Sequence, residues 1–323
     1  MKSVKIEDAV GQILCHDMTQ IIPGVFKGAK FKKGHILKEE DIPVLRSMGK
    51  DHIFIYEYDE DKYHEDEAAE VLSSICKGEN ITSSSPSEGK VDLFASVDGL
   101  LKVDSDLLYK INSMPELMIA TKLNDKPVKK NDKIAGTRVI PLVIDKKNVD
   151  LAVETAKDKK ILNILPYKNL KAGIITTGSE VYYGRIKDSF TDKVRDKIKK
   201  FNMTEIGQRY CTDDTDFISE SIKELLSLGS DIIFCCGGMS VDPDDKTPGA
   251  INSVCDTMVT YGAPVLPGAM FALGYVKDIP VCGLPGCVMF SPKTIFDIVL
   301  PRLAAGEKIK KEDICALGHG GLI

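Results

Sequence analysis

The stretch that decides the fold is "CCGGMSVDPDDKTPGA", residues 235–250. It follows the apolar run "DIIF", so it begins where a buried strand ends. Two adjacent glycines, Gly237 and Gly238, would let backbone N–H groups approach an anion closely. The aspartates that follow suit a divalent cation such as Mg²⁺, which bridges carboxylate and phosphate oxygens. The alternative is a solvated turn that only ends the strand, and spacing alone leaves both interpretations open.

Strand-like and helix-like segments alternate on both sides of this stretch. Apolar runs in "AGIITT", "TEIGQRY", "DIIFCC" and "IPVCGL" predict strands, while Phe190, Val194 and Ile198 recur at helical spacing. "MFSPKTIFDIVLPRL", residues 289–303, predicts a final helix. Buried strands between amphipathic helices indicate an α/β fold, a mostly parallel sheet with helices on both faces.

Three of the predicted strands end in glycine-containing turns. These turns are Gly178-Ser179-Glu180, Gly237 to Ser240, and Leu284-Pro285-Gly286-Cys287. Ligands of open parallel sheets bind beyond the carboxyl ends of the strands, so the three turns predict one site. Neither a GxxxxGK[ST] loop nor a GxGxxG fingerprint is present, so the spacing is not that of a common nucleotide site. Thr247 and Pro248 are expected to cap and open the next helix.

The N-terminal half has a different texture. Residues 1–80 predict a small α+β segment, and 81–165 predict a small β-rich domain that begins with the loop "TSSSPSEGK". The α/β domain is expected over residues 166–305, with a tail at 306–323. Smaller β-rich N-terminal domains therefore precede the parallel sheet.

Composition sets further limits. The chain has 323 residues, of which 43% are hydrophobic. Its net charge of −5 disfavours general binding to nucleic acid or to a membrane surface. With no apolar run of about 18 residues and no apolar signal core, a cytoplasmic location is expected. The nine cysteines include no CxxC pair, which favours buried free thiols over a zinc or iron–sulfur site.

Four motifs carry a family resemblance. In order they are "ITTGSEVYYGRIKDSF", "CTDDTDFI", "GGMSVDPDDKTP" and "LPGCVMF". Their order resembles the signature of the molybdopterin-binding domain shared by MogA, MoeA, gephyrin and CinA-type proteins. The motifs lie within residues 171–303, and residues 171–305 are expected to fold and bind ligand as an autonomous unit. A C-terminal α/β block preceded by small β-rich segments is similar to the MoeA type, although the N-terminal half lacks its motifs and indicates a MoeA-related subgroup.

The resemblance implies roles for individual residues. Asp213 and Asp245 match the two aspartates associated with activity, and Asp245 would also bind the metal. Ser179, Phe190, Met239-Ser240 and Cys287 depart from the family's pattern. The implied cofactor-binding residues are Thr177, Gly178, Ser179, Glu180, Asp188, Ser189, Asp214, Gly237, Gly238, Met239, Ser240, Thr247, Pro285 and Gly286.

Two functions of different classes follow from the resemblance. The first is an enzyme of molybdenum-cofactor maturation, leaning to a molybdopterin molybdotransferase or related transferase. It would use Mg²⁺ to insert molybdate or to activate molybdopterin with a nucleotide. The second is a non-catalytic carrier, chaperone or sensor that delivers the cofactor to a recipient molybdoenzyme. A pterin ligand and a homodimer are implied in either case, with no nucleic acid or membrane partner.

Overall fold

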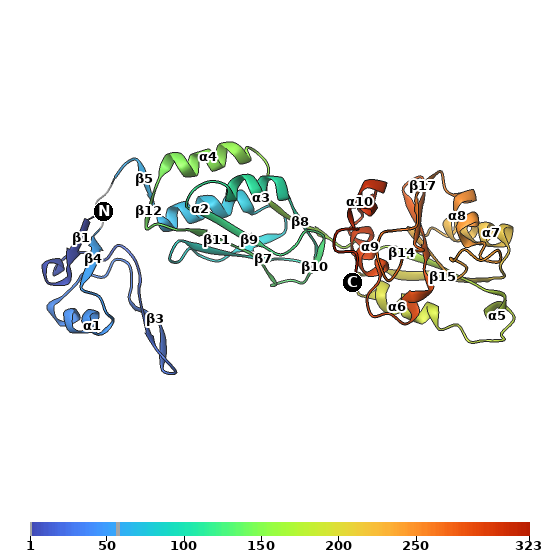
Figure 1. The fold of residues 1–323 in the computed structure, drawn as a ribbon, viewed down its shortest axis with the longest axis horizontal. Coiled ribbons are helices and arrows are strands. Elements are labelled where there is room, and N and C mark those ends of the chain that lie inside the picture. The colour runs from blue at the N-terminus through green and yellow to red at the C-terminus, as the bar shows by residue number, and fades with distance from the viewer. Residues whose placement is uncertain (1, 56–58) are drawn as a thin grey trace. The chain divides into compact units, whose positions relative to one another are not determined.

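The structure, a computed structural model, describes residues 2–55 and 59–323 (Figure 1). The chain divides into two compact units. The N-terminal unit comprises Met1–Val97, Leu101–Asn124 and Val128–Ile164, and the C-terminal unit comprises Asp98–Leu100, Asp125–Pro127 and Leu165–Ile323. Within the described residues, no helix is both long enough and apolar enough to cross a membrane.

The N-terminal unit has two cores. In its first part the antiparallel pairs β1–β4 and β2–β3 accompany α1, and Leu14, Leu45 and Ile53 form a small buried cluster. The elements are β1 (Lys2–Lys5), β2 (Met18–Ile22), β3 (Phe26–Phe31), α1 (Ile42–Ser47) and β4 (His52–Ile55).

The second part of the N-terminal unit is built on a four-stranded sheet of order β6-β7-β11-β9. Helices α2 and α4 contact each other, and Ala68, Leu72 and Val149 on them lie in one core with the inward residues of the sheet. The elements from residue 62 onward are β5 (Lys62–His64), α2 (Glu65–Cys76), β6 (Ile81–Ser83), β7 (Lys90–Ala95), β8 (Gly99–Val103), α3 (Ser105–Asn112), β9 (Leu117–Thr121), β10 (Lys126–Val128), β11 (Lys133–Val139), β12 (Val143–Asp145), α4 (Lys146–Ala156) and β13 (Leu162–Pro166).

The C-terminal unit contains a six-stranded sheet of order β15-β14-β16-β19-β18-β17. The first four strands in this order are parallel, β18 pairs antiparallel with β19 and β17 pairs antiparallel with β18, so the predicted mostly parallel sheet is confirmed. Its elements are β14 (Lys171–Thr177), α5 (Ser179–Tyr182), α6 (Phe190–Lys199), β15 (Thr204–Cys211), α7 (Thr215–Ser227), β16 (Ile232–Cys236), α8 (Thr247–Val254), β17 (Thr257–Tyr261), β18 (Ala272–Val276), β19 (Ile279–Leu284), α9 (Ile295–Ala304) and α10 (Lys311–Ala316).

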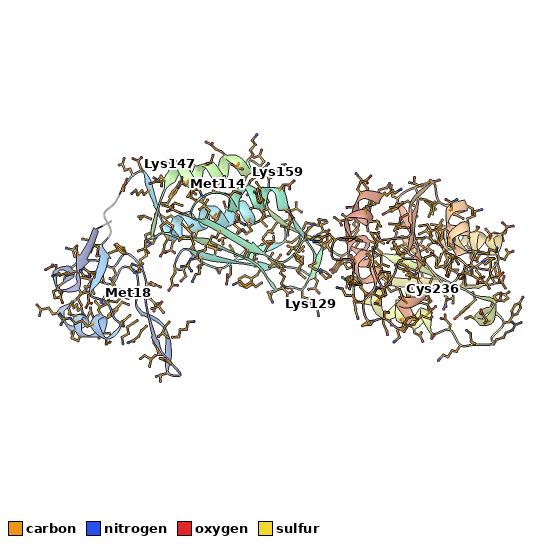
Figure 2. All side chains as sticks on the ribbon, viewed as in Figure 1. Met18, Met114, Lys129, Lys147, Lys159 and Cys236 are labelled. Atoms are coloured by element: carbon orange, nitrogen blue, oxygen red, sulfur yellow. The ribbon has the colours of Figure 1, made fainter. Side chains whose placement is uncertain are left out.

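Helices cover both faces of this sheet, as predicted. Along β16, Phe234 and Cys236 belong to the core beneath α6 and α9, while Ile233 and Cys235 belong to the core beneath α7 and α8. This alternation follows from the two-residue period of a strand. Figure 2 marks Cys236 among the packed side chains of the unit.

Helix boundaries differ from the sequence prediction in two places. The expected helix at 289–303 begins only after Thr294, whose hydroxyl accepts from the Phe296 N–H at 3.2 Å as an N-cap. Pro292 and this cap account for the late start. At α8 the N-cap is Lys246, so Thr247 is the first helical residue rather than the expected cap.

Candidate functional site

The three predicted turns lie at one edge of the sheet. Strands β14, β16 and β19 are adjacent and parallel, and their carboxyl ends lead into Gly178, Gly237 and Pro285. β15, which precedes Asp213, is the parallel neighbour of β14. The fold therefore brings the motifs together at the edge where such sheets bind ligands.

The glycine pair after β16 is required by its surroundings. Gly237 has φ +103° and Gly238 has φ +57°, conformations that favour glycine. A Cβ on Gly237 would lie 2.6 Å from the carbonyl oxygen of Thr177, and one on Gly238 would lie 2.7 Å from Oγ1 of Thr247. The hydroxyls of Thr177 and Thr247 are buried and lie 3.1 Å apart, so they form the floor beneath the loop rather than its surface.

Met239 anchors the loop to the core. Its side chain is 3% exposed and belongs to the cluster beneath α7 and α8, where it packs so closely on Gly283 that an added Cβ would lie 2.5 Å from it. On the other side, the Tyr261 hydroxyl lies 3.1 Å from the Met239 carbonyl and 3.2 Å from the Ser240 carbonyl, and donates to them. The methionine that departs from the family's pattern thus fixes the loop from inside.

A cavity of about 380 Å³ opens at this loop. Of the predicted site residues it is lined by Gly237, Gly238, Met239, Ser240, Asp245, Pro285 and Gly286. Residues 268–270 and Cys287 complete the wall. Sequence reasoning missed residues 268–270; the only local signal was the Pro-Gly pair in "VLPGAMF".

The C-terminal tail supports this missed wall. The backbone N–H of Leu266 donates to the carbonyl of Gly321 at 2.7 Å, and the N–H of Ile323 donates to Leu266 at 3.0 Å. Leu317 and Ile323 also pack against the core beneath α6 and α9. The tail at 306–323 is therefore part of the folded unit that carries the site.

Asp245 lies at the mouth of the cavity, where its Oδ2 accepts from the Ser240 N–H at 2.9 Å. Asp242 has a different role, because its carbonyl and its Oδ1 accept from the backbone N–H groups of Asp245 and Asp244. Of these three carboxylates only that of Asp245 lines the cavity. The acidic stretch thus contains one residue facing the ligand space and one that shapes the loop.

Asp213 joins the first turn to the acidic pair. Its Oδ2 accepts from both the N–H and the hydroxyl of Ser179, each at 2.9 Å. Asp214 caps α7 by accepting from the Phe217 N–H at 2.8 Å. Glu180 is exposed in the short helix α5. These residues lie at the carboxyl edge but outside the lining of the cavity.

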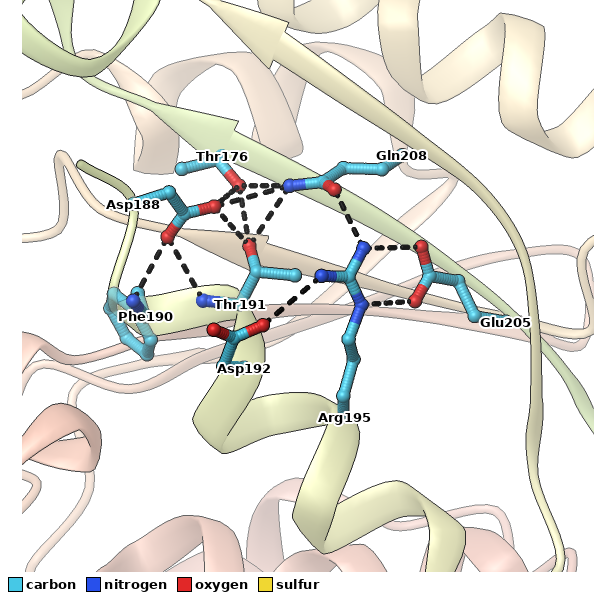
Figure 3. A network of polar contacts seen from close by, with 8 residues as sticks. All are labelled: Thr176, Asp188, Phe190, Thr191, Asp192, Arg195, Glu205 and Gln208. Atoms are coloured by element: carbon cyan, nitrogen blue, oxygen red, sulfur yellow. Dashed lines mark hydrogen bonds and ion pairs between the residues drawn. The ribbon is translucent and has the colours of Figure 1, made fainter.

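Asp188 is the centre of a polar network (Figure 3). Its Oδ1 accepts from the N–H groups of Phe190 and Thr191, and its Oδ2 accepts from the hydroxyls of Thr176 and Thr191. Burial alone would raise the pKa of the Asp188 carboxyl, but hydrogen bonds from Thr191 and its neighbours outweigh it, and the net pKa lies below its ordinary value.

The amide of Gln208 extends the network to a second layer. Its Nε2 lies 3.1 Å from Oδ2 of Asp188, and its Oε1 accepts from Arg195 at 2.8 Å (Figure 3). Arg195 in turn binds Glu205 through two N–H groups at 2.6 and 2.9 Å. Phe190, which replaces the family's asparagine, is buried at 5% exposure and packs in the core instead of facing a ligand.

The polar groups that line the cavity suit an anionic ligand that binds together with a cation. Among the lining residues that the structure describes, none is lysine or arginine, and Asp245 is the charged one. Backbone N–H groups at the glycines can donate to phosphate oxygens, but a carboxylate beside a phosphate requires an intervening cation. Asp245 is the residue that would hold Mg²⁺ there.

Two segments match known protein families. Residues 173–305 match a family described as "Probable molybdopterin binding domain". Residues 3–57 match a domain of unknown function.

Curated relatives support the first match. A molybdopterin molybdenumtransferase of Haemophilus influenzae is 26% identical over 153 residues, which are 45% of this chain and 37% of the relative. A CinA-like protein of Petrotoga mobilis is 30% identical over 92 residues, 28% of this chain and 23% of the relative. The chain thus spans less than half the length of either relative.

Solved structures of similar fold include two molybdopterin biosynthesis proteins. The enzyme MoaB of Thermus thermophilus is 19% identical with a TM-score of 0.37, covering 44% of this chain and 99% of that one. The MoeA protein of Pyrococcus horikosii is 16% identical with a TM-score of 0.36, covering 76% of this chain and 81% of that one. Residues 173–305, less than half of the chain, are thus similar to the molybdopterin-binding domain family.

Proposed function

We propose that the C-terminal unit binds molybdopterin at the carboxyl edge of its sheet and that the chain acts in maturation of the molybdenum cofactor. The observation that carries the proposal is the 380 Å³ cavity, where the family's glycine loop and Asp245 meet Pro285 and Gly286. Glycine backbone donors bind the phosphate, and the apolar walls at residues 268–270 and 285–287 accept the ring system.

Within this proposal the chain's own groups have distinct tasks. Gly237 and Gly238 present backbone donors, and Met239 and Tyr261 keep the loop rigid so that the donors need no reorganisation. Mg²⁺ bound at Asp245 would supply charge neutralisation between phosphate and carboxylate. Asp213, held by Ser179, assists at the neighbouring strand end. We further propose that Asp188, with both carboxylate oxygens engaged internally, positions the turn rather than contacting the ligand.

A maturation enzyme is favoured over a carrier because both aspartates associated with activity in the family stand at the carboxyl edge. The test is a turnover assay of the full chain with molybdopterin, molybdate and a nucleotide, with and without Mg²⁺. Product formation that requires Mg²⁺ is expected. Tight binding without turnover under every nucleotide tested would contradict the enzyme and support a carrier, while absence of binding would overturn the proposal altogether.

A further inference from the structure

A second group of metal-ligating side chains lies in the N-terminal unit, where β5 leads into α2. One ring nitrogen of His64 and one carboxylate oxygen each of Glu65 and Asp66 lie within 4.8 Å of one another. His64 is 4% exposed and Glu65 is 6% exposed. This group is separate from the molybdopterin cavity, and none of its residues belongs to a motif of that domain.

The ring of His64 is held in an orientation suited to a ligand. Its Nε2 lies 2.7 Å from the carbonyl oxygen of Cys15, which can only accept, so Nε2 carries the proton. The lone pair is then on Nδ1, which accepts from the Asp66 N–H at 3.2 Å and lies 3.8 Å from Oδ2 of Asp66. Histidines that bind metals usually donate the other ring N–H to a carbonyl or carboxylate in this way.

The carboxylate of Glu65 provides independent support. Although the residue is only 6% exposed, its carboxylate accepts no hydrogen bond and forms no ion pair within residues 2–55 and 59–323. Asp66, in contrast, accepts from the Gly89 N–H at 3.2 Å. The oxygens of Glu65 keep some contact with solvent, because they are not among the fully buried side-chain atoms without a partner, and a cation between this carboxylate and its neighbours would supply the missing partner.

A cation already stands at this position. The ammonium of Lys33 lies 3.0 Å from Nδ1 of His64 and 3.6 Å from Oδ2 of Asp66. The side chain of Lys33 is 46% exposed, so the ammonium can swing into solvent. The first turn of a helix carries roughly half a positive charge. The acidic residues in the first turn of α2, which are Glu65, Asp66 and Glu67, carry more negative charge than this positive partial charge.

We propose that His64, Glu65 and Asp66 bind a divalent first-row cation of the Mn²⁺ or Zn²⁺ class, and that Lys33 occupies its place when the metal is absent. One imidazole and two carboxylates form a mixed nitrogen and oxygen set, which suits these ions better than a soft metal. Metal binding expels the lysine ammonium, so the lysine competes with the ion.

The test uses the full chain carrying Asp245→Asn, which removes the proposed Mg²⁺ ligand of the other site. Chelator-treated protein is titrated with Mn²⁺, followed by electron paramagnetic resonance of the free ion, and in parallel with Zn²⁺ against a chromophoric chelator. One ion per chain is expected. Glu65→Gln or Asp66→Asn should weaken binding by roughly tenfold or more. Lys33→Met should strengthen it, since the competing ammonium is gone.

Glu70→Gln is the matched control, because it removes an exposed carboxylate from the same helix and should leave binding unchanged. Circular dichroism confirms that each variant is folded. The proposal is overturned if neither ion binds in a way that depends on Glu65 and Asp66. It is also overturned if only the Lys33→Met chain binds, since the lysine would then be the permanent cation of the site.

Discussion

Oδ2 of Asp213 accepts hydrogen bonds from both the backbone N–H and the hydroxyl of Ser179, each at 2.9 Å. Ser179 stands at a position where the family's pattern has an aspartate. A second carboxylate at this position would repel Asp213, whereas the serine hydroxyl donates a hydrogen bond to it. The turn after β14 and the acidic pair after β15 are therefore locked together through an attractive contact.

Removing this hydroxyl should loosen the acidic pair. Ser179→Ala is expected to lower stability by about 1–2 kcal/mol, because a hydrogen bond to a charged group is lost while the backbone bond remains. Ser179→Asp should cost more at neutral pH than at pH 4, where a carboxyl can be protonated. Thermal melts of the two variants at both pH values measure these losses. Equal destabilisation of Ser179→Asp at neutral pH and at pH 4 would contradict the expected repulsion.

The glycine loop offers a second test with a built-in control. Gly238→Ala places a Cβ 2.7 Å from the Thr247 hydroxyl at a positive φ, so we expect a loss of roughly 1–3 kcal/mol. Gly249→Ala lies in α8 with no atom within 4 Å of the added Cβ, and should be neutral or stabilising by about 0.5–1 kcal/mol. Chemical denaturation of the two variants measures their free energies of unfolding. Similar losses of stability in Gly238→Ala and Gly249→Ala would contradict the close packing of the loop.

The lowered pKa of Asp188 predicts a pH dependence. The folded pKa lies below the unfolded one, so the stability that Asp188 contributes is present above its unfolded value and is lost as pH falls through its folded value. Asp188→Asn should therefore lower the melting temperature at pH 7. The difference from the unsubstituted chain should shrink below about pH 4. A difference that stays constant down to pH 2 would show that the charge plays no part in the network of Figure 3.

The tail should matter for the site. Gly321→Ala places a Cβ 2.2 Å from the carbonyl oxygen of Pro264, which cannot yield easily, so the pairing of the tail with Leu266 should break. We expect faster amide exchange at Leu266 and weaker molybdopterin binding, because residues 268–270 follow directly. Leu322→Ser is the control, since that side chain is 87% exposed. Unchanged exchange at Leu266 in Gly321→Ala would contradict the supporting role.

The contacts of the tail also enlarge the smallest part of the chain that we expect to fold by itself. A fragment of residues 171–305, expected from the motifs to be autonomous, would lack Ile309, Ile314, Leu317 and Ile323, which lie in or against the core beneath α6 and α9. We therefore expect residues 165–323 to melt cooperatively and bind molybdopterin, and 165–305 to melt earlier or aggregate. Calorimetry of the two fragments compares them, and equal stability would show that the tail is dispensable.

The sequence predicted the features that local patterns encode. Apolar runs and helical spacing located the parallel strands, and the glycines at 178 and 237–238 located strand ends at the carboxyl edge of the sheet, of which the second lines the cavity. Features made by distant segments left no local signal. Tyr261 reaches the loop from β17, and the tail reaches Leu266 across more than fifty residues, so neither could be read from spacing.

Two side chains show how burial changes an interpretation. Met239 departs from the family's pattern in the glycine loop, and its side chain turns into the core because Gly283 leaves room for it. His64 has no second histidine beside it, but one ligand atom each of its chain neighbours Glu65 and Asp66 lies within 4.8 Å of its ring.

The central claim is that Asp245 meets a cation at the phosphate of molybdopterin, whereas Asp242 only shapes the loop. The most direct measurement is calorimetric titration of molybdopterin into the full chain, Asp245→Asn and Asp242→Asn, each with and without Mg²⁺. We expect Mg²⁺ to strengthen binding to the full chain and to Asp242→Asn. For Asp245→Asn the Mg²⁺ effect should vanish, with a loss of up to about 3 kcal/mol, roughly a hundredfold, in any Mg²⁺-dependent turnover. The same Mg²⁺ dependence in Asp245→Asn as in the unsubstituted chain would contradict the account.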